Sequence, residues 1–171
     1  MITAICPGSY DPVTNGHVDV IRRAAAIFDR IVVGVVRDPQ HKQTLFSVEE
    51  RVAFLEAALS HVPNVVVDVF SELVVEFARK HDAKTMVKGL RVISDFEWEF
   101  QMHHLNRTLA PEIETMYLIA THEYSFLSSS AVKEIAAFGG NVDGLVPEPV
   151  ARRFQELFPR PLPGAPVSPQ E

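Results

Sequence analysis

The chain of 171 residues is 47% hydrophobic and 22% charged, and its formal net charge is −6. This length and composition predict one globular domain with a sizeable core, and the negative charge argues against a nonspecific nucleic-acid binder. The single cysteine excludes an internal disulfide and is typical of a reducing compartment. The sequence has the pattern of neither a signal peptide nor a membrane span, so we expect a cytoplasmic protein that does not bind a membrane.

Apolar runs and helical patterns alternate along the chain. A continuous apolar run predicts a buried strand at residues 31–36, and we expect further strands at residues 2–5, 65–70, 84–88 and 116–120. Apolar residues at helical spacing predict helices at residues 18–28, after Ser47, after Ser71, after Ser94, at 131–138 and at 150–157. This alternation is typical of the α/β class, and it predicts a doubly wound, five-stranded parallel sheet of the Rossmann type with right-handed crossovers.

Serines stand at three of the predicted helix starts. Ser47 is followed three residues later by Glu50, and Ser94 is followed by Glu97, which is the spacing of a capping box. Ser71 is placed to cap the helix between them. The helix after Ser94 is expected to have an apolar side made of Phe96, Phe100, Leu105 and Leu109.

No linker or internal repeat divides the chain, so we assign a single domain to residues 1–158. Residues 159–171 contain five prolines and few side chains that could pack against a core. We expect this proline-rich tail to be disordered.

The first strand is joined to the first helix by the stretch CPGSYDPVTNGH, residues 6–17. The start of a helix presents unbonded N–H groups and a partial positive charge, which favour an anion such as phosphate, and His17 could donate to the same anion. The two glycines fit neither GxGxxG nor GxxxxGK, so a turn shaped only by glycine and proline is an equal alternative. Cys6 has no base beside it, and we do not expect it to be a nucleophile.

In a doubly wound sheet, ligands bind beyond the carboxyl ends of the strands, so the loops at that edge carry the chemistry. Lys42 follows the second strand, and Lys88 and Arg91 flank Gly89, which is expected to end the fourth strand. Hydroxyl groups follow the fifth strand in the stretch YSFLSSS, residues 124–130. Together these cations and donors predict a polyphosphate site. Taken singly, each has an ordinary alternative as a solvated lysine, a helix cap or a surface side chain.

Four blocks of the sequence, taken together, resemble the phosphopantetheine adenylyltransferase family of the nucleotidyltransferase superfamily. In matching order and spacing, they are PGSYDPVTNGH at 7–17, KGLR at 88–91, DFEWE at 95–99 and YSFLSSS at 124–130. The resemblance covers residues 2–158. Thr14 stands where the superfamily motif has its first histidine, which is typical of this family. The loop at residues 37–46 is one residue longer than usual, and Lys88 replaces an arginine that is often seen there.

The resemblance implies an enzyme that transfers the adenylyl group of ATP to 4'-phosphopantetheine, giving dephospho-coenzyme A and pyrophosphate. The acceptor phosphate would attack the α-phosphorus in line, without a protein nucleophile. A magnesium ion is expected between the substrate oxygens, with no protein ligand. The family also implies a homohexamer, a trimer of dimers, and feedback binding of coenzyme A.

The resemblance further assigns roles to single residues. Catalysis would use His17, Lys42, Lys88 and Arg91. The acceptor would be bound by Ser9, Lys42, Val74 and Lys88. ATP would be bound by Ser9, Tyr10, His17, Gly89, Leu90, Arg91, Glu99, Tyr124, Ser125, Phe126, Leu127, Ser128, Ser129 and Ser130. His17 would stabilise the transition state at the α-phosphate, while Lys42 and Lys88 would hold the incoming phosphate.

Other functions stay open at this point. One is an adenylyl- or cytidylyltransferase with another phosphate acceptor, such as nicotinamide mononucleotide or glycerol phosphate. Another is a non-catalytic nucleotide sensor on the same fold, and a flavodoxin-like redox module is a third that fits the cation-rich loops less well. His103 and His104 have no further metal ligand at a suitable spacing, and we interpret them as surface or interface residues.

Overall fold

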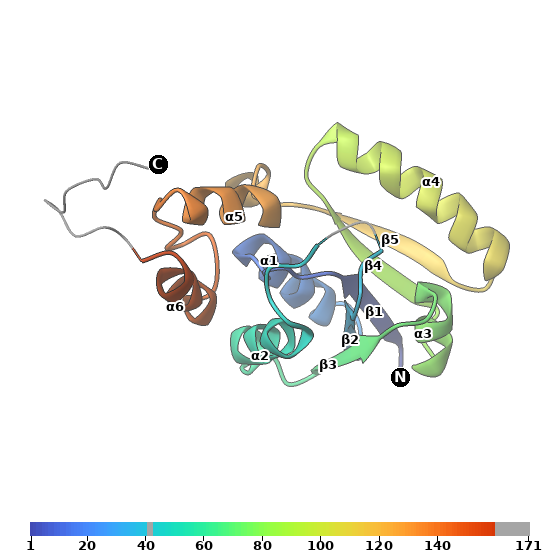
Figure 1. Cartoon of the computed structure of the whole chain (residues 1–171). Helices are drawn as coiled ribbons and strands as arrows, with labels where there is room; N and C mark the ends of the chain where they lie inside the picture. Colours follow the sequence, from blue (N-terminus) through green and yellow to red (C-terminus); the bar gives the residue numbers. More distant parts are fainter. Residues whose placement is uncertain (41–42, 160–171) are drawn as a thin grey trace, which may run out of the picture.

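A computed structural model describes residues 1–40 and 43–159 (Figure 1). The strands are β1 (Thr3–Gly8), β2 (Arg30–Val36), β3 (Val65–Phe70), β4 (Thr85–Leu90) and β5 (Glu114–Ile119). The helices are α1 (Asn15–Ala25), α2 (Val48–Leu59), α3 (Val74–Lys80), α4 (Ile93–Leu109), α5 (Ser129–Ala137) and α6 (Glu148–Leu157), with a short 3-10 turn η1 (His122–Tyr124). Every predicted strand and helix is present, and β3 has the predicted bounds.

The strands form one parallel sheet in the order β3-β2-β1-β4-β5. The chain winds outward from β1 through β2 to β3, and then returns to the other side of β1 as β4. This confirms the predicted fold class, a doubly wound five-stranded α/β sheet. The strand order reverses between β1 and β4, which is the place where such sheets bind ligands.

Helices cover both faces of the sheet, and alternate residues of the central strands point to opposite faces. Ala4 and Cys6 of β1 and Val33 of β2 belong to a core cluster shared with α1, α2, α5 and α6. Ile5 and Val32 belong to a second cluster, which is shared with α3 and the segment after α4. The central strands are therefore buried on both faces, as their continuous apolar sequences predict.

Of the serine caps predicted for α2 and α3, the structure contains the first and lacks the second. Ser47 forms the predicted capping box: its hydroxyl accepts from Glu50 N–H at 3.2 Å, and Glu50 Oε2 accepts from Ser47 N–H at 3.0 Å. The prediction that Ser71 caps the next helix is wrong. The helix starts two residues later than a cap at Ser71 would require, so its N-cap is Leu73, which makes no side-chain cap bond.

The predicted capping box at Ser94 and Glu97 is also wrong. The N-cap of α4 is Val92, so Ser94 lies within the first turn of the helix. Asp95, in the same first turn, accepts the backbone N–H of Arg91, just before the helix, at 3.2 Å. The start of α4 is therefore stabilised by an acidic side chain in its first turn.

Gly89 does not end β4, contrary to the prediction. It stays in the strand and pairs with Leu118 of β5. A Cβ at this position would lie 3.0 Å from Val20 Cγ2 in α1. The absence of a side chain at Gly89 therefore lets α1 pack closely against β4.

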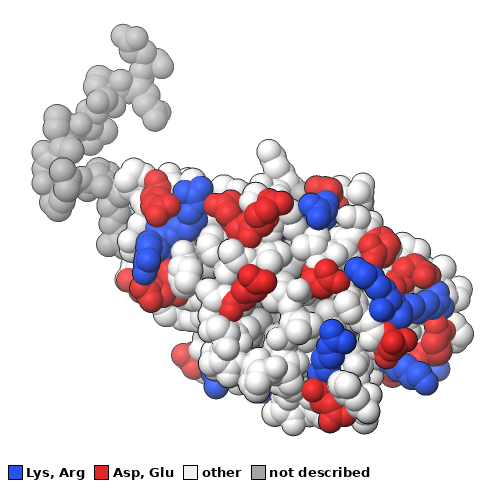
Figure 2. Space-filling view, turned by 90° about the horizontal axis from the view of Figure 1, so that it is seen from below, with Lys and Arg blue, Asp and Glu red and all other residues white. Residues whose placement is uncertain are grey.

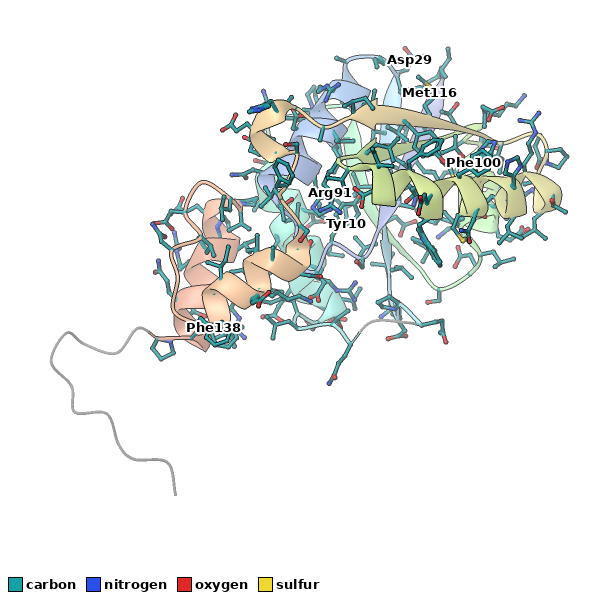
Figure 3. All side chains as sticks on the ribbon, turned by 90° about the horizontal axis from the view of Figure 1, so that it is seen from above. Tyr10, Asp29, Arg91, Phe100, Met116 and Phe138 are labelled. Atoms are coloured by element: carbon teal, nitrogen blue, oxygen red, sulfur yellow. The ribbon has the colours of Figure 1, made fainter. Side chains whose placement is uncertain are left out.

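The four apolar residues predicted to form one side of α4 do not do so. Phe96 and Leu105 are nine positions apart, which at ~3.6 residues per turn places them on opposite sides of the helix. All four side chains are between 48% and 59% exposed: Phe96, Phe100, Leu105 and Leu109. Figure 3 labels Phe100 on α4, which lies beside β5 at one edge of the molecule in Figure 1. This helix therefore exposes two apolar strips, one with Phe96 and Phe100 and the other with Leu105 and Leu109.

Charged side chains of both signs are intermixed on the face shown in Figure 2. Exposed pairs such as Arg79–Glu76 and Arg107–Glu114 join neighbouring cations and carboxylates. Such pairs contribute little to stability, and the intermixing does not favour a nucleic-acid interface on this face.

Across residues 1–40 and 43–159, no helix combines the length and the apolar character that a membrane span requires. Of the proline-rich tail predicted to be disordered, residues 160–171 lie outside the described part of the chain.

Candidate active site

The candidate site lies at the carboxyl ends of β1 and β4, where the sheet reverses its strand order. Figure 3 shows Tyr10 and Arg91 near the middle of the molecule, between α4 and α5. Arg91 Nη1 donates to the carbonyl of Leu127 at 2.7 Å, and Ser129 Oγ donates to the carbonyl of Pro12 at 2.8 Å. The structure thus brings together the loops after β1, β4 and β5, three of the loops that the sequence singled out.

The turn between β1 and α1 is buried, and a local hydrogen bond stabilises it. Tyr10 adopts a left-handed backbone with φ of 48°, and its buried hydroxyl donates to the Cys6 carbonyl at 2.8 Å. Burial raises the pKa of Tyr10 well above its usual value. Its ring meets His17 edge-on, with 5.2 Å between ring centroids. Tyr10, which was predicted to bind ATP, therefore packs against the ring of His17. Its hydroxyl is already hydrogen-bonded within the protein.

His17 and Thr14 close the start of α1. Thr14 Oγ1 accepts from His17 N–H at 3.4 Å, and His17 Nδ1 accepts from Thr14 N–H at 3.0 Å, so the two residues form a capping box. Because Nδ1 accepts a backbone N–H, the neutral imidazole carries its proton on Nε2. The helix start thus fixes both the orientation and the tautomer of His17, and the ring keeps an N–H donor.

Gly16 lets the start of α1 approach the loop after β5. A Cβ on Gly16 would lie 3.2 Å from Tyr124 Cβ and 3.8 Å from Leu127 Cδ2. Two of the predicted ATP-binding residues, Tyr124 and Leu127, therefore pack against the helix that carries His17. Phe126, another predicted ATP-binding residue, is largely exposed in the same loop.

The serines predicted to bind phosphate also have partners in the protein. Ser128 Oγ caps α5 by accepting from Ala131 N–H at 3.1 Å, and Ser129 Oγ is the donor to the β1–α1 turn. Ser130 is exposed in the first turn of α5, and Ser125 Oγ donates within η1 at 2.9 Å. Ser128 and Ser129 therefore position the loop, whatever they bind in addition.

The predicted phosphate-binding cations pair with carboxylates of α4. Lys88 Nζ lies 3.2 Å from Glu99 Oε1. Arg91 forms a fork with Asp95, in which Nε and Nη2 each donate to one carboxylate oxygen at 3.0 Å. Glu99, which was assigned to the ATP site, is thus the counter-charge of Lys88, and Arg91 joins α4 to the loop after β5.

The remaining predicted site residues lie as follows. Gly89 and Leu90 are the last residues of β4, and the Leu90 side chain is buried. Ser9 is half-buried in the turn after β1, and Val74 is half-buried at the start of α3, beyond the carboxyl end of β3. Lys42, predicted to be catalytic, lies outside the described residues.

Cys6 lies in β1 with its side chain buried. Burial raises the pKa of the thiol to about 12, and the nearby charge of Lys88 offsets only part of this rise. The thiol is therefore protonated at neutral pH, in agreement with the interpretation that Cys6 is not a nucleophile.

The carboxylates near the site do not form a metal cage. Within the described part of the chain, no group of three or more His, Cys, Asp or Glu side chains could hold a metal ion. Asp95 and Glu99 each face a cation, and the buried Asp11 pairs with Lys133. These donors do not by themselves fit a resident magnesium ion.

The sequence analysis missed a set of buried charges behind the turn. The Arg51 side chain in α2 is 1% exposed. Arg51 donates at 2.8–2.9 Å to the carbonyl oxygens of Ser9, Val36 and Arg37. Asp11 is also buried, and it accepts the N–H groups that precede α2 together with the ammonium of Lys133. The local sequence pattern gave no signal for either residue, because charged side chains are usually solvated.

Comparison with known proteins decides the family. The cytidylyltransferase-like family model matches residues 5–135. The phosphopantetheine adenylyltransferase of Thermosynechococcus vestitus is 52% identical over 161 residues, which cover 94% of this chain and 95% of that protein. The phosphopantetheine adenylyltransferase of Dictyoglomus thermophilum is 51% identical over 158 residues, which cover 92% and 96% of the two chains. This chain belongs to the phosphopantetheine adenylyltransferase family.

A solved structure supports the fold independently. The structure of a putative nicotinate-nucleotide adenylyltransferase from Vibrio parahaemolyticus has a TM-score of 0.67 and 15% identity, and the match covers 92% of this chain and 93% of that one. At this identity the likeness concerns the fold alone.

Family membership makes the chain a nucleotidyltransferase enzyme. The alternatives of a non-catalytic sensor and a redox module are therefore not supported. Three of the family's four sequence blocks, at residues 7–17, 88–91 and 124–130, supply the loops that touch one another at the site.

Proposed function

We propose that this chain transfers the adenylyl group of ATP to 4'-phosphopantetheine, producing dephospho-coenzyme A and pyrophosphate. The observation that carries the proposal is the identity of 52% with a phosphopantetheine adenylyltransferase over nearly the whole of both chains. The turn, cations and helix starts at the β1–β4 edge provide the groups that such a transfer needs. Synthesis of a coenzyme A precursor in the cytoplasm is the setting that we propose.

The reaction requires positioning and charge stabilisation rather than a protein nucleophile. The acceptor phosphate attacks the α-phosphorus of ATP while pyrophosphate leaves on the opposite side. His17 supports this step, because its fixed tautomer directs an N–H donor from the start of α1, where the helix dipole also favours negative charge. A donor held in this way stabilises charge on the α-phosphate without reorganising during the reaction.

Lys88 and Arg91 are proposed to hold phosphate oxygens next to this centre. In the protein alone they pair with Glu99 and Asp95, which keeps both cations at the ligand edge of β4. Bound phosphates would share these cations with the carboxylates, and a monodentate Lys88 would bind its phosphate as a point charge. Lys42 is proposed to act with Lys88 on the acceptor phosphate. Ser9 and Val74 are proposed to line the acceptor's path.

ATP is proposed to lie along the loops after β4 and β5. The close packing of Tyr124 and Leu127 against α1 supports this position, since it makes the loop one wall of the site. The start of α5 adds N–H groups that favour an anion. Magnesium is proposed to enter with the nucleotide, coordinated by phosphate oxygens and water, because residues 1–40 and 43–159 offer no cage for it.

A homohexamer is proposed as the working assembly, and the surface of α4 supports association. A helix with one buried and one solvated side is the rule for surface helices, whereas α4 exposes apolar strips on opposite sides. Two strips on different sides suit two kinds of contact between copies, which a trimer of dimers requires. Coenzyme A is proposed to bind at the same site as a feedback ligand, because it contains both halves of the product.

The identity of the phosphate acceptor distinguishes the proposed function from that of a nucleotidyltransferase with another acceptor. Pyrophosphate release should be measured with ATP and a panel of phosphorylated acceptors: 4'-phosphopantetheine, nicotinamide mononucleotide and glycerol 3-phosphate. We expect release only with 4'-phosphopantetheine, with dephospho-coenzyme A as the second product. Faster release with another acceptor would replace the proposed substrate, and ATP binding without release in any mixture would contradict the proposed reaction.

A further inference from the structure

Asp11 is a buried carboxylate with partners from two other segments of the chain. Its side chain is 5% exposed and lies 2.7 Å from Lys133 Nζ in α5. It also accepts the backbone N–H groups of Leu45 at 3.0 Å and Phe46 at 2.9 Å, just before α2. A buried charge is costly unless it is paired and hydrogen-bonded, and Asp11 meets both conditions. The carboxylate therefore joins the β1–α1 turn to α5 and to the start of α2.

The residues on either side of Asp11 are fixed as well. Arg51 Nη1 donates to the carbonyl of Ser9 at 2.8 Å, and Ser129 Oγ donates to the carbonyl of Pro12 at 2.8 Å. The turn is thus held at three successive points by groups from α2 and α5. None of these anchors belongs to the turn itself, so its position depends on long-range contacts.

The held turn leads directly into the reacting groups. Ser9 lies two residues before Asp11, and the capping box of Thr14 and His17 follows three to six residues after it. A shift of about 1 Å in a positioning element can lower turnover about 100-fold, because in-line transfer needs close alignment. The anchors of the turn therefore bear on catalysis, although they contact no substrate group.

We propose that Asp11 and Lys133 form a positioning pair that sets the β1–α1 turn, and with it Ser9 and His17, for adenylyl transfer. The inference rests on the proposed function and adds two residues to it that none of the predicted roles included. Lys133 pairs with Asp11 and orients its carboxylate, while Asp11 holds the turn against Leu45 and Phe46. Neither residue is a catalytic residue, since each acts through the turn.

Lys133 is the better residue to change, because it is partly exposed and its loss leaves no hole in the core. Lys133→Met keeps the length of the side chain and removes its charge, and Lys133→Arg restores the charge. Asp11→Asn and the double variant Asp11→Asn/Lys133→Met complete a cycle. Arg153→Met is the matched control, because Arg153 Nε lies 2.7 Å from Glu50 Oε1 in another ion pair between helices, α6 and α2.

Kinetics with ATP and 4'-phosphopantetheine test the pair. We expect kcat of Lys133→Met to fall about 10-fold or more with little change in KM for ATP, and kcat of Lys133→Arg to stay within about threefold of wild type. The double variant should be no slower than the slower single variant, because the two residues act as a unit. Arg153→Met should leave kcat unchanged. An unchanged kcat in Lys133→Met, or effects that multiply in the double variant, would overturn the inference.

Amide hydrogen exchange provides a readout that does not depend on activity. Exchange at Leu45 and Phe46 should be about fivefold faster or more in Lys133→Met than in wild type, and unchanged in Arg153→Met. Unaltered exchange at both amides would also overturn the inference. If wild type releases no pyrophosphate with any acceptor, the proposed function fails, and the exchange result then judges the anchoring of the turn separately.

Discussion

The turn before α1 and the surface of α4 are opposite kinds of structure in one small molecule. In the turn, Tyr10 and Asp11 are buried, and the polar groups of both side chains are hydrogen-bonded within the protein. On α4, large apolar side chains such as Phe96 and Phe100 are about half exposed, at 48% and 51%. The buried side chains of the turn find their partners within the single chain, whereas the apolar side chains of α4 are left uncovered.

This difference indicates which function each region is suited to perform. A turn held by long-range hydrogen bonds has little freedom left, so it suits the alignment of reacting groups. An apolar surface without a cover gains stability when another molecule covers it, so it suits association. The predictions that follow test whether the turn is held as rigidly as its contacts indicate, and whether the apolar surface of α4 is available for association.

The largest effect is expected for the thiol beneath the turn. Cys6 has a pKa of about 12 and is 2% exposed, so alkylation at pH 8 should be at least about 10³-fold slower than for an exposed thiol. Labelling followed by mass spectrometry measures the rate, with denatured protein as the positive control. A second control is Phe138→Cys in a Cys6→Ser background, because Phe138 is 86% exposed. Rapid labelling of Cys6 in folded protein would show that the turn opens readily.

A change on α4 should alter the association state. Phe100→Asp places a charge in one apolar strip, and we expect it to reduce the proposed hexamer to smaller species without unfolding the chain. Light scattering coupled to size exclusion measures the mass, and circular dichroism checks the fold. Phe138→Asp is the control on α5 and should leave the mass unchanged. A monomeric wild type would show that α4 has no partner copy.

A smaller effect is expected where the turn meets α1. Thr14→Ala removes the hydroxyl that accepts His17 N–H, and it should lower the free energy of unfolding by about 1 kcal/mol. Thr14→Ser keeps the hydroxyl and should stay close to wild type. Urea unfolding measures both. Equal stability of Thr14→Ala and wild type would mean that the capping box does not fix the start of α1.

The smallest effect is expected from a surface charge outside both regions. Partial burial alone would raise the pKa of Glu50, but hydrogen bonds from Ser47 and Arg153 together lower it below its usual 4.5. The folded protein therefore binds this proton less tightly than the unfolded chain, so the stabilisation is complete above pH 4.5 and is lost as the pH falls through the lower folded-state pKa.

Glu50→Gln tests this sign, since glutamine keeps an acceptor for the capping box. Its melting temperature should be about 1–2 °C below wild type at pH 7, and the difference should vanish near pH 3. A difference that grew on acidification would contradict the lowered pKa of Glu50.

The sequence was sufficient for the fold because its signals are local. The run Val65–Phe70 is β3 at the predicted bounds, and the alternation of strands and helices allows few other topologies. Helix starts were less predictable: Ser71 is a residue type that caps helices and Ser94 has the spacing of a capping box, yet α3 and α4 start elsewhere because tertiary contacts set the chain's path.

The loops that form the candidate site could be predicted from the sequence, but the buried charged residues that hold them in place could not. The loops around His17, Arg91 and Leu127 meet as expected from the carboxyl-edge rule. The burial of Asp11 and Arg51 was not predictable from local pattern, because charged residues are usually solvated. Their partners lie 14 to 122 residues away in sequence, and no spacing rule reaches that far.

The most direct test of the central claim is the rate of adenylyl transfer by His17→Ala. Removal of a donor fixed toward the α-phosphate should lower kcat about 100-fold or more, while the affinity for ATP measured by calorimetry stays close to that of wild type. The assay is pyrophosphate release with ATP and 4'-phosphopantetheine at saturating concentrations. Near-normal turnover in His17→Ala at unchanged ATP affinity would contradict the role of the β1–α1 turn in the reaction.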